Sequence, residues 1–186
     1  MNTVPLGRSG VNVSALCLGA MYFGSRTDNE TSWQLLDQYT EAGGSFIDTA
    51  NIYARWVPGC SGGESETLLG EWMRERTNRE QLFIASKVGF EYPGVERGLP
   101  AWRIEEECDK SLKRLGIDTI DLYYAHVDDR QTSQEETLEA FNTLVSSGKV
   151  RLIGGSNFLA WRLEDAAWIS RTRKWAEYCC VQQRHQ

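Results

Sequence analysis

The sequence has no long apolar run and no leader-like start. No apolar stretch approaches the roughly 20 residues that a membrane-spanning helix needs. No basic segment followed by an apolar one opens the chain. We therefore expect no membrane partner, and a cytoplasmic location is the default expectation.

An excess of basic residues is also absent. The chain has 20 Lys and Arg against 26 Asp and Glu, which gives a net charge of -6 at pH 7. Binding to nucleic acid by counterion release requires clustered Lys and Arg, whereas here charges of both signs are mixed along the chain. The sequence therefore argues against a nucleic-acid partner.

The cysteines lack any pattern of pairing. There are 5 of them, an odd number, and they show neither the spacing of metal ligands nor that of a disulfide framework. We expect reduced thiols that are mostly buried, and no metal site. The positions concerned are Cys17, Cys60, Cys108, Cys179 and Cys180.

What the sequence does contain is a regular alternation of apolar runs and amphipathic stretches, which is typical of strand–helix units around a parallel sheet. Residues 4–13 predict a small hairpin outside that sheet. At 41% hydrophobic and with no linker, residues 1–186 are interpreted as one domain or part of one. Core strands are predicted over residues 15–19, 45–48, 82–87, 120–126, 151–156 and 179–182, with five helices between them.

Local signals predict where two of these helices begin and end. Thr27 with Glu30, and Thr132 with Glu135, fit the capping box at a helix start. The glycines at positions 43–44 and at position 148 are expected to end the same two helices.

Two folds fit this order of elements: an open doubly wound sheet and a (β/α)8 barrel, which typically needs about 250 residues. A dinucleotide-binding doubly wound domain would carry Gly-x-Gly-x-x-Gly after its first strand, and residues 18–24 lack it. The barrel is therefore favoured, with about the first five and a half units present. Four tryptophans are expected to pack between helices and barrel: Trp102, Trp161, Trp168 and Trp175.

Ionisable side chains close several of the predicted strands. Asp48, Lys87 and His126 each end a strand, and Tyr53 follows shortly after the first of them. In a barrel, functional residues come from the carboxyl ends of several strands. The four are therefore expected to meet at one mouth and to act as a catalytic quartet.

The chemistry of the quartet suits protonation of an alkoxide that forms from a carbonyl. Tyr53, with an ordinary pKa of about 10, is a protonated acid, and Lys87 is expected to lower that pKa. Asp48 is expected to pair with Lys87, and His126 to orient the substrate oxygen. Taken singly, each of the three strand-end residues has a structural alternative: a hydrogen-bonded histidine, a salt-bridged lysine and a capping aspartate.

Further along, Ser156 and Asn157 end the fifth strand and Gln183 follows the sixth. These groups could hold a nicotinamide carboxamide. The combination of residues 48–53, Lys87, His126, residues 154–157 and residues 181–184 resembles the aldo-keto reductases. The resemblance covers the whole chain in order, and as a combination it is specific.

The resemblance implies a (β/α)8 barrel that binds NADPH, less often NADH, and reduces an aldehyde or ketone. It also implies that Tyr53 is the general acid, that Lys87 and Asp48 tune it, and that His126 positions the carbonyl. By the same match, Ser156, Asn157 and Gln183 hold the nicotinamide. Within the family, the chain is similar to a bacterial group related to potassium-channel β-subunits and to aryl-alcohol or sugar ketoreductases.

The chain departs from the pattern of many relatives in three places. Residues 54–62 form a longer loop, expected to shape the substrate pocket with Trp56 as a wall. Residues 127–129 follow His126 where many members have a proline. The last strands and helices, which in the family contact the 2′-phosphate and substrate, are absent from this sequence, so residues 1–186 are expected to be a partial barrel domain.

Met21 and Tyr22, just after the first strand, are candidates for the substrate pocket, with packing as the alternative. Two other functions stay open. One is a cofactor-sensing binding subunit, as in the channel β-subunits, and the other is an inactive fragment. A homo-oligomer, or completion of the barrel by further chain, is among the assemblies expected.

Overall fold

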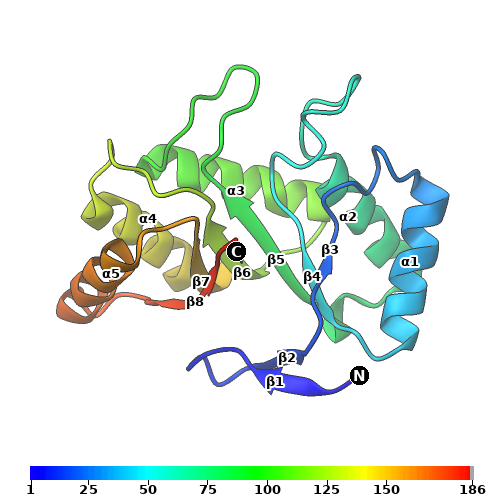
Figure 1. The fold of residues 1–186 in the computed structure, drawn as a ribbon, viewed down its shortest axis with the longest axis horizontal. Helices are drawn as coiled ribbons and strands as arrows, with labels where there is room; N and C mark the ends of the chain where they lie inside the picture. The colour runs from blue at the N-terminus through cyan, green and yellow to red at the C-terminus, as the bar shows by residue number, and fades with distance from the viewer. Residues whose placement is uncertain (185–186) are drawn as a thin grey trace.

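The structure is a computed structural model, and it describes residues 1–184. It is an α/β fold in which a two-stranded hairpin precedes a six-stranded sheet whose strands alternate with helices (Figure 1). The elements are β1 (Thr3–Pro5), β2 (Asn12–Ser14), β3 (Leu18–Gly19), α1 (Asn29–Glu41), β4 (Phe46–Asp48), α2 (Glu64–Arg76), a 3-10 turn (Arg79–Gln81), β5 (Phe83–Val88), α3 (Ala101–Leu115), β6 (Ile120–Ala125), α4 (Gln134–Ser146), β7 (Val150–Ser156), α5 (Ala160–Arg173) and β8 (Tyr178–Gln182).

The strand order identifies the architecture. The sheet runs β3-β4-β5-β6-β7-β8, and every neighbouring pair is parallel. A doubly wound sheet reverses its strand order at a switch point, whereas a barrel adds each new strand beside the previous one. The prediction of a partial (β/α)8 barrel is confirmed: the six strands form a curled half-barrel with the helices outside it.

Alternation along each strand separates two sets of side chains. Phe83 and Ala85 of β5 pack with Leu122 and Tyr124 of β6 and with the hairpin, on the inner face of the half-barrel. The intervening residues of both strands, such as Ile84 and Tyr123, pack against the helices. Because side chains alternate with a period of two, Lys87 shares the inner face with Ala85.

The hairpin covers the floor of the half-barrel, at the end opposite the loops that follow β4 and β5 (Figure 1). Val13 packs with Phe83 and Leu122. Ser14, 1% exposed, accepts hydrogen bonds at its Oγ from the backbone N–H groups of Ser45 and Phe46, at 3.1 and 3.0 Å. This buried hydroxyl therefore joins the hairpin to the start of β4.

The two predicted capping boxes are wrong by one residue. α1 is capped by Asp28, whose Oδ1 accepts the N–H of Thr31 at 2.8 Å, and α4 by Ser133, whose Oγ accepts the N–H of Glu136 at 3.1 Å. In both places two neighbouring residues can cap a helix, and the later one takes the position. The glycines after both helices end them as predicted, Gly43 and Gly148 having φ of 82° and 77°.

The first strand of the sheet is shorter than predicted. β3 covers only residues 18–19 of the predicted 15–19, because it is an edge strand that pairs with β4 alone.

The burial of cysteines and tryptophans also differs from the prediction. The cysteines are not mostly buried: only Cys108 is buried, whereas Cys17 is exposed beside β3 and the pair in β8 is half-buried. Three tryptophans predicted to pack under helices are instead 60–65% exposed: Trp102, Trp161 and Trp168.

Each helix within residues 1–184 is too short or too polar to span a bilayer.

Candidate active site

The structure brings the predicted quartet together at the carboxyl ends of β4, β5 and β6. Lys87 Nζ lies 2.6 Å from Asp48 Oδ2 and 2.7 Å from Tyr53 Oη. The rings of Tyr53 and His126 lie 6.2 Å apart between centroids. All four side chains are buried. The sequence had placed three of them at strand ends, and parallel strands bring those ends to one side.

The backbone after β4 turns across the end of β5 and carries Tyr53 over Lys87. The N–H of Thr49 donates to the carbonyl of Ala85 at 2.9 Å, and the N–H of Asn51 donates to the carbonyl of Lys87 at 3.2 Å. Ala54, directly after Tyr53, has φ of 77°, a left-handed conformation that is costly for a residue with a Cβ. The turn therefore has a specific backbone path that aims the phenol at the ammonium.

The ammonium of Lys87 is fully buried and all its hydrogens are used. It donates to Asp48, to Tyr53 and, at 2.7 Å, to the carbonyl of Thr49. Burial lowers the pKa of Lys87, and the charge of Asp48 opposes that change. Pairing of the Lys87 ammonium with the Asp48 carboxylate offsets the free-energy cost of removing both charges from water. The carbonyl of Thr49 was not among the predicted partners, since sequence reasoning considered side chains only.

The pKa of Tyr53 is raised, which corrects the expectation that Lys87 lowers it. Burial of the phenol is the main cause, and the carboxylate of Asp48, with Oδ2 3.4 Å from the phenol oxygen, adds to it. The sequence could place a cation near Tyr53, but it could not show how deeply the phenol is buried. The phenol is therefore held protonated, and the ammonium of Lys87 lies beside its oxygen.

His126 is held as a neutral imidazole. Burial lowers its pKa to about 3, and the charges of Lys87 and Arg97 contribute. Its Nδ1 is buried and makes no hydrogen bond within the described part of the chain. The ring of Phe90 packs against it edge-on, with centroids 4.6 Å apart. Sequence reasoning missed Phe90, whose only signal is its place in the loop directly after the Lys87 strand.

Of the three candidate pocket residues, Trp56 packs against the quartet, and Tyr22 packs against Trp56. Trp56 packs edge-on against both Tyr22 and Tyr53, at centroid distances of 6.3 and 6.2 Å. Tyr22 and Trp56 are about two-fifths exposed, and so is Met21 in the same turn as Tyr22. Trp56 thus lies next to the ring of Tyr53, and its role as a wall of the substrate pocket stays a prediction. The place of Met21 in the pocket stays a prediction.

The loop after His126 is secured by α5 rather than by a proline. Arg162 Nε lies 2.9 Å from Asp128 Oδ1, and the same guanidinium donates to the carbonyl of Asp129 at 2.8 Å. Asp129 Oδ2 also accepts the N–H of Leu99 at 2.8 Å. The two acidic residues therefore connect this loop both to α5 and to the loop before α3.

Ser156, Asn157 and Gln183 lie at the carboxyl ends of β7 and β8, and Asn157 contacts the histidine backbone. Asn157 Nδ2 donates to the carbonyl of His126 at 2.9 Å and to Ser156 Oγ at 3.1 Å, and Asn157 has φ of 61°. Gln183 Nε2 donates to the carbonyl of Phe158 at 2.6 Å. The structure thus brings the predicted cofactor residues to the same mouth as the quartet.

The sequence is similar to that of known proteins over most of its length. Residues 15–186 match the family described as the Aldo/keto reductase family. The chain belongs to this family. Its relatives include an uncharacterized oxidoreductase, YrpG, of Bacillus subtilis strain 168, which is 43% identical over 87% of this chain and 51% of its own length.

Two fungal members of the aldo/keto reductase family are also similar. The norsolorinic acid reductase stcV of Emericella nidulans is 37% identical over 95% of this chain and 48% of its own length. An aryl-alcohol dehydrogenase [NADP(+)] of Phanerodontia chrysosporium is 34% identical over 84% of this chain and 44% of its own length. The chain spans about half the length of the curated relatives it matches.

Aldo/keto reductases generally use nicotinamide cofactors, and the free groups at this mouth fit a nicotinamide carboxamide. Within residues 1–184, the hydroxyl hydrogen of Ser156 is donated to no partner, and neither Asn157 Oδ1 nor Gln183 Oε1 accepts a hydrogen bond. One donor and two acceptors match the carbonyl oxygen and the NH₂ of a carboxamide.

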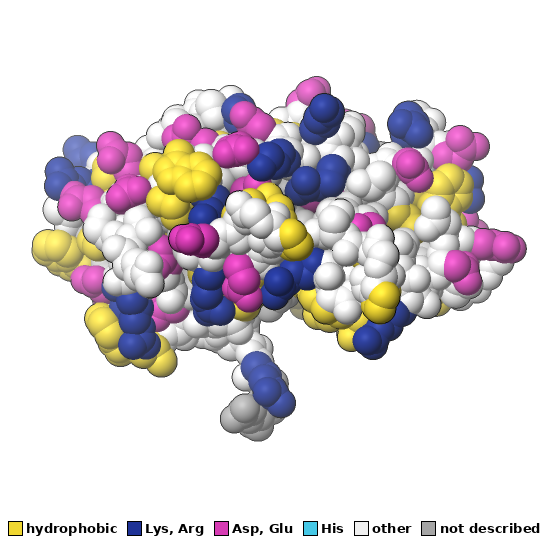
Figure 2. All heavy atoms as spheres, turned by 90° about the horizontal axis from the view of Figure 1, so that it is seen from above, with side chains coloured by type: hydrophobic (Ala, Val, Ile, Leu, Met, Phe, Trp, Pro, Cys, Tyr) yellow, Lys and Arg dark blue, Asp and Glu magenta, His cyan; other side chains and the backbone are white. Residues whose placement is uncertain are grey.

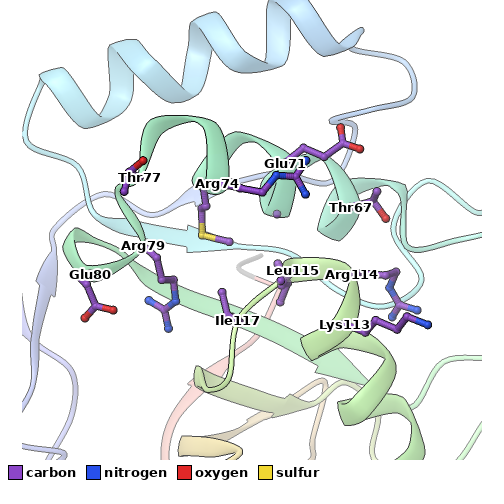
Figure 3. A pocket seen from close by; sticks show the side chains of 13 residues that line it. Thr67, Glu71, Arg74, Thr77, Arg79, Glu80, Lys113, Arg114, Leu115 and Ile117 are labelled. Carbon is purple, nitrogen blue, oxygen red and sulfur yellow. The ribbon is translucent and has the colours of Figure 1, made fainter.

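A groove of about 660 Å³ lies elsewhere on this aldo/keto reductase, between α2 and the last turn of α3 (Figure 3). Arg74 and Lys113 point along its rim, and Leu115 and Ile117 form part of its wall. Both helices end here, so these cations offset the negative carboxyl ends of the helix dipoles. No quartet residue lines the groove in the described part of the chain, so the groove is separate from the candidate active site.

Figure 2 views the protein from the side of the loops that follow β4 and β5. Acidic and basic side chains are interspersed across this face, and neither sign forms a continuous field.

Proposed function

We propose that this protein is an NADPH-dependent reductase that converts an aldehyde or a ketone to an alcohol, with Tyr53 as the general acid. The observation that supports it is the buried ammonium of Lys87, placed between Asp48 and the phenol oxygen at 2.6 and 2.7 Å. A protonated phenol with an adjacent cation suits proton donation to an oxygen that gains negative charge.

Bound NADPH supplies the hydride. Ser156, Asn157 and Gln183 would hold its carboxamide beside the quartet. The substrate carbonyl would enter between Tyr53 and His126, whose neutral ring can donate a hydrogen bond to the carbonyl oxygen. As that oxygen becomes an alkoxide, Tyr53 transfers its proton to it, and Lys87 stabilises the phenolate that remains. Trp56 would exclude water on one side of the reacting oxygen.

The decisive experiment is Tyr53→Phe, followed by NADPH oxidation with a panel of aldehydes and ketones. We expect kcat to fall by about 10²–10⁴-fold, the usual contribution of a positioned acid. The dissociation constant for NADPH, measured by fluorescence, should change little because the phenol does not hold the carboxamide. Turnover retained at the level of the unmodified protein would contradict the mechanism.

Tyr123→Phe is the matched control. Tyr123 is fully buried on the helix-facing side of β6, and its hydroxyl has no partner within residues 1–184. Its removal should leave kcat unchanged. Tight NADPH binding with no turnover of any carbonyl by the unmodified protein would instead favour a cofactor-sensing subunit.

A further inference from the structure

A buried carboxylate outside the quartet connects to both of its loops. Glu107 lies on the inward side of α3 and is 2% exposed. Its Oε2 accepts a hydrogen bond from Asn51 Nδ2 at 2.6 Å, and its Oε1 accepts one from Tyr92 Oη at 2.5 Å. Lys110, one turn later on the same helix, donates to Oε1 at 2.9 Å.

The two loop partners of Glu107 lead directly to reacting groups. Asn51 lies two residues before Tyr53, is 4% exposed, and donates its backbone N–H to the carbonyl of Lys87 at 3.2 Å. Tyr92 belongs to the loop of Phe90, the ring that packs on His126. One carboxylate therefore joins the turn of the acid to the loop beside the imidazole.

Ionisation suits Glu107 to this role. A carboxylate only accepts hydrogen bonds, and each of the three partners is a donor. Burial acts to raise the pKa of Glu107, but hydrogen bonds from Tyr92, Lys110 and Asn51 outweigh it and bring the pKa below its ordinary value. Hydrogen bonds to a charged group are about twice as strong as neutral ones.

A second connection between the same loops is weak by comparison. Arg55 and Glu91 form an ion pair at 3.0 Å, with side chains that are 30% and 45% exposed. Exposed pairs of this kind contribute about 0–1 kcal/mol. The buried contacts of Glu107 are therefore the main polar link that we identify between the two loops.

We propose that Glu107 is a positioning residue, which holds the Tyr53 turn and the Phe90 loop in register so that acid and imidazole face one substrate oxygen. The catalytic part of this inference rests on the proposed reductase function. Glu107 acts through Asn51 and Tyr92 and does not touch the reacting atoms.

The test is Glu107→Gln in the full protein. A glutamine is neutral and has one acceptor oxygen: that oxygen can still accept from Asn51, but its NH₂ then faces the Tyr92 hydroxyl and the Lys110 ammonium, so the hydrogen bonds to a charged acceptor are lost and both loops are held more weakly. Since a misplacement of about 1 Å can cost about 10²-fold in rate, we expect kcat to fall at least tenfold while the NADPH dissociation constant changes less than twofold. Backbone hydrogen exchange, measured without cofactor, should accelerate in residues 49–54 and 89–99.

Single-loop variants separate the two arms of the link. Tyr92→Phe should accelerate exchange in residues 89–99 only, and it should raise KM more than it lowers kcat. Asn51→Ala should accelerate exchange in residues 49–54 and lower kcat. If Glu107→Gln does not fold, these two variants still test the link, and unchanged loop exchange in both would overturn it.

Cys108→Ala is the matched control. Cys108 is fully buried on the same helix and contacts the core, so its truncation should lower stability without changing loop exchange or kcat. A Glu107→Gln protein that is destabilised like Cys108→Ala, with normal kcat and normal loop exchange, would show a merely structural role. Loop exchange does not depend on turnover, so failure of the link and failure of the reductase proposal, read from Tyr53→Phe, are distinguished.

Discussion

Lys87 and His126 show how burial determines the charge state of single residues at this mouth. The ammonium of Lys87 stays inside the protein because Asp48 and two neutral oxygens accept its hydrogens. His126 has no such partner at Nδ1 within residues 1–184 and is held neutral. The same buried environment therefore keeps the ammonium of Lys87 and disfavours a protonated His126, because a buried charge needs an opposite charge or hydrogen-bond partners.

Replacing Lys87 by Met should destabilise the protein by about 3–5 kcal/mol, because the carboxylate of Asp48 is left buried without a partner. The double variant with Lys87→Met and Asp48→Asn should recover part of that loss, since no uncompensated charge remains. Urea unfolding of the four proteins in the cycle measures both quantities. Equal stability of the single and double variants would contradict this account of the pair.

His126 should make stability depend on pH. Its pKa is about 3 in the folded protein, and about 6.5 in an unfolded chain. As pH falls below the unfolded value, the unfolded chain binds the proton first, so stability is lost at up to about 1.4 kcal/mol per pH unit until the folded pKa is reached.

This titration can be isolated with His126→Gln. Urea unfolding of both proteins between about pH 7 and pH 4 gives the change in their stability difference, and the carboxylates common to both cancel. We expect the unmodified protein to lose stability faster than the variant as pH falls. A stability difference that is constant with pH would show that His126 is not held neutral.

Among the elements, α2 and α3 approach each other closely at Gly70. A Cβ built there would sit 2.4 Å from the carbonyl oxygen of Arg114. Gly70 is not in a left-handed conformation. A glycine is needed at this position because a side chain would clash with α3, and not because of the backbone angles. The close contact brings together two helices that each supply a buried acid: Glu66 of α2, bonded to Ser86 of β5, and Glu107 of α3.

The sign of the stability change in Gly70→Ala tests this close packing. Helix propensity alone would stabilise α2 by about 1 kcal/mol, whereas the clash with backbone atoms should destabilise the protein by about 1–3 kcal/mol. We expect a lower melting temperature in thermal unfolding. Glu71→Ala, at the neighbouring exposed position, should be close to neutral, and a stabilised Gly70→Ala protein would contradict the packing.

The elements also show where sequence reasoning ends. Strand ends at Lys87 and His126 were predictable because an apolar run stops at an ionisable residue. The helix starts were off by one because Thr27 and Asp28 can both cap. Glu107 was missed because it looks like its neighbours Glu105 and Glu106. Its spacing from Ile104, three residues before it, places it on the buried face, and that periodicity could have identified it.

For the whole molecule, the half-barrel leaves β3 and β8 as edge strands within residues 1–184. Leu16 beside β3 and Val181 in β8 are 67% and 53% exposed. Unpaired strand edges are templates for pairing with further chain. The order of the strands could be predicted from the sequence, but the exposure of the edge residues could not, because it depends on what each strand pairs with.

A polypeptide of these 186 residues should therefore self-associate through its edges. Light scattering after size-exclusion chromatography should give a mass above that of one chain, rising with concentration. Adding a charge to the exposed edge strand β8, as in Val181→Lys, should shift the distribution toward the monomer. A monodisperse monomer at all concentrations would contradict the role of the edges.

The hairpin under the half-barrel has a practical consequence for handling the protein. Because β1 and β2 cover the end opposite the quartet, a purification tag or surface anchor fused before Met1 would project away from the mouth that holds the quartet (Figure 1). Such a fusion would change the surroundings of the terminal amine, which donates a 2.9 Å hydrogen bond to the carbonyl of Ala42. A protein immobilised in this way would present the mouth with the candidate active site to the flowing solution in biosensor measurements of cofactor and carbonyl binding.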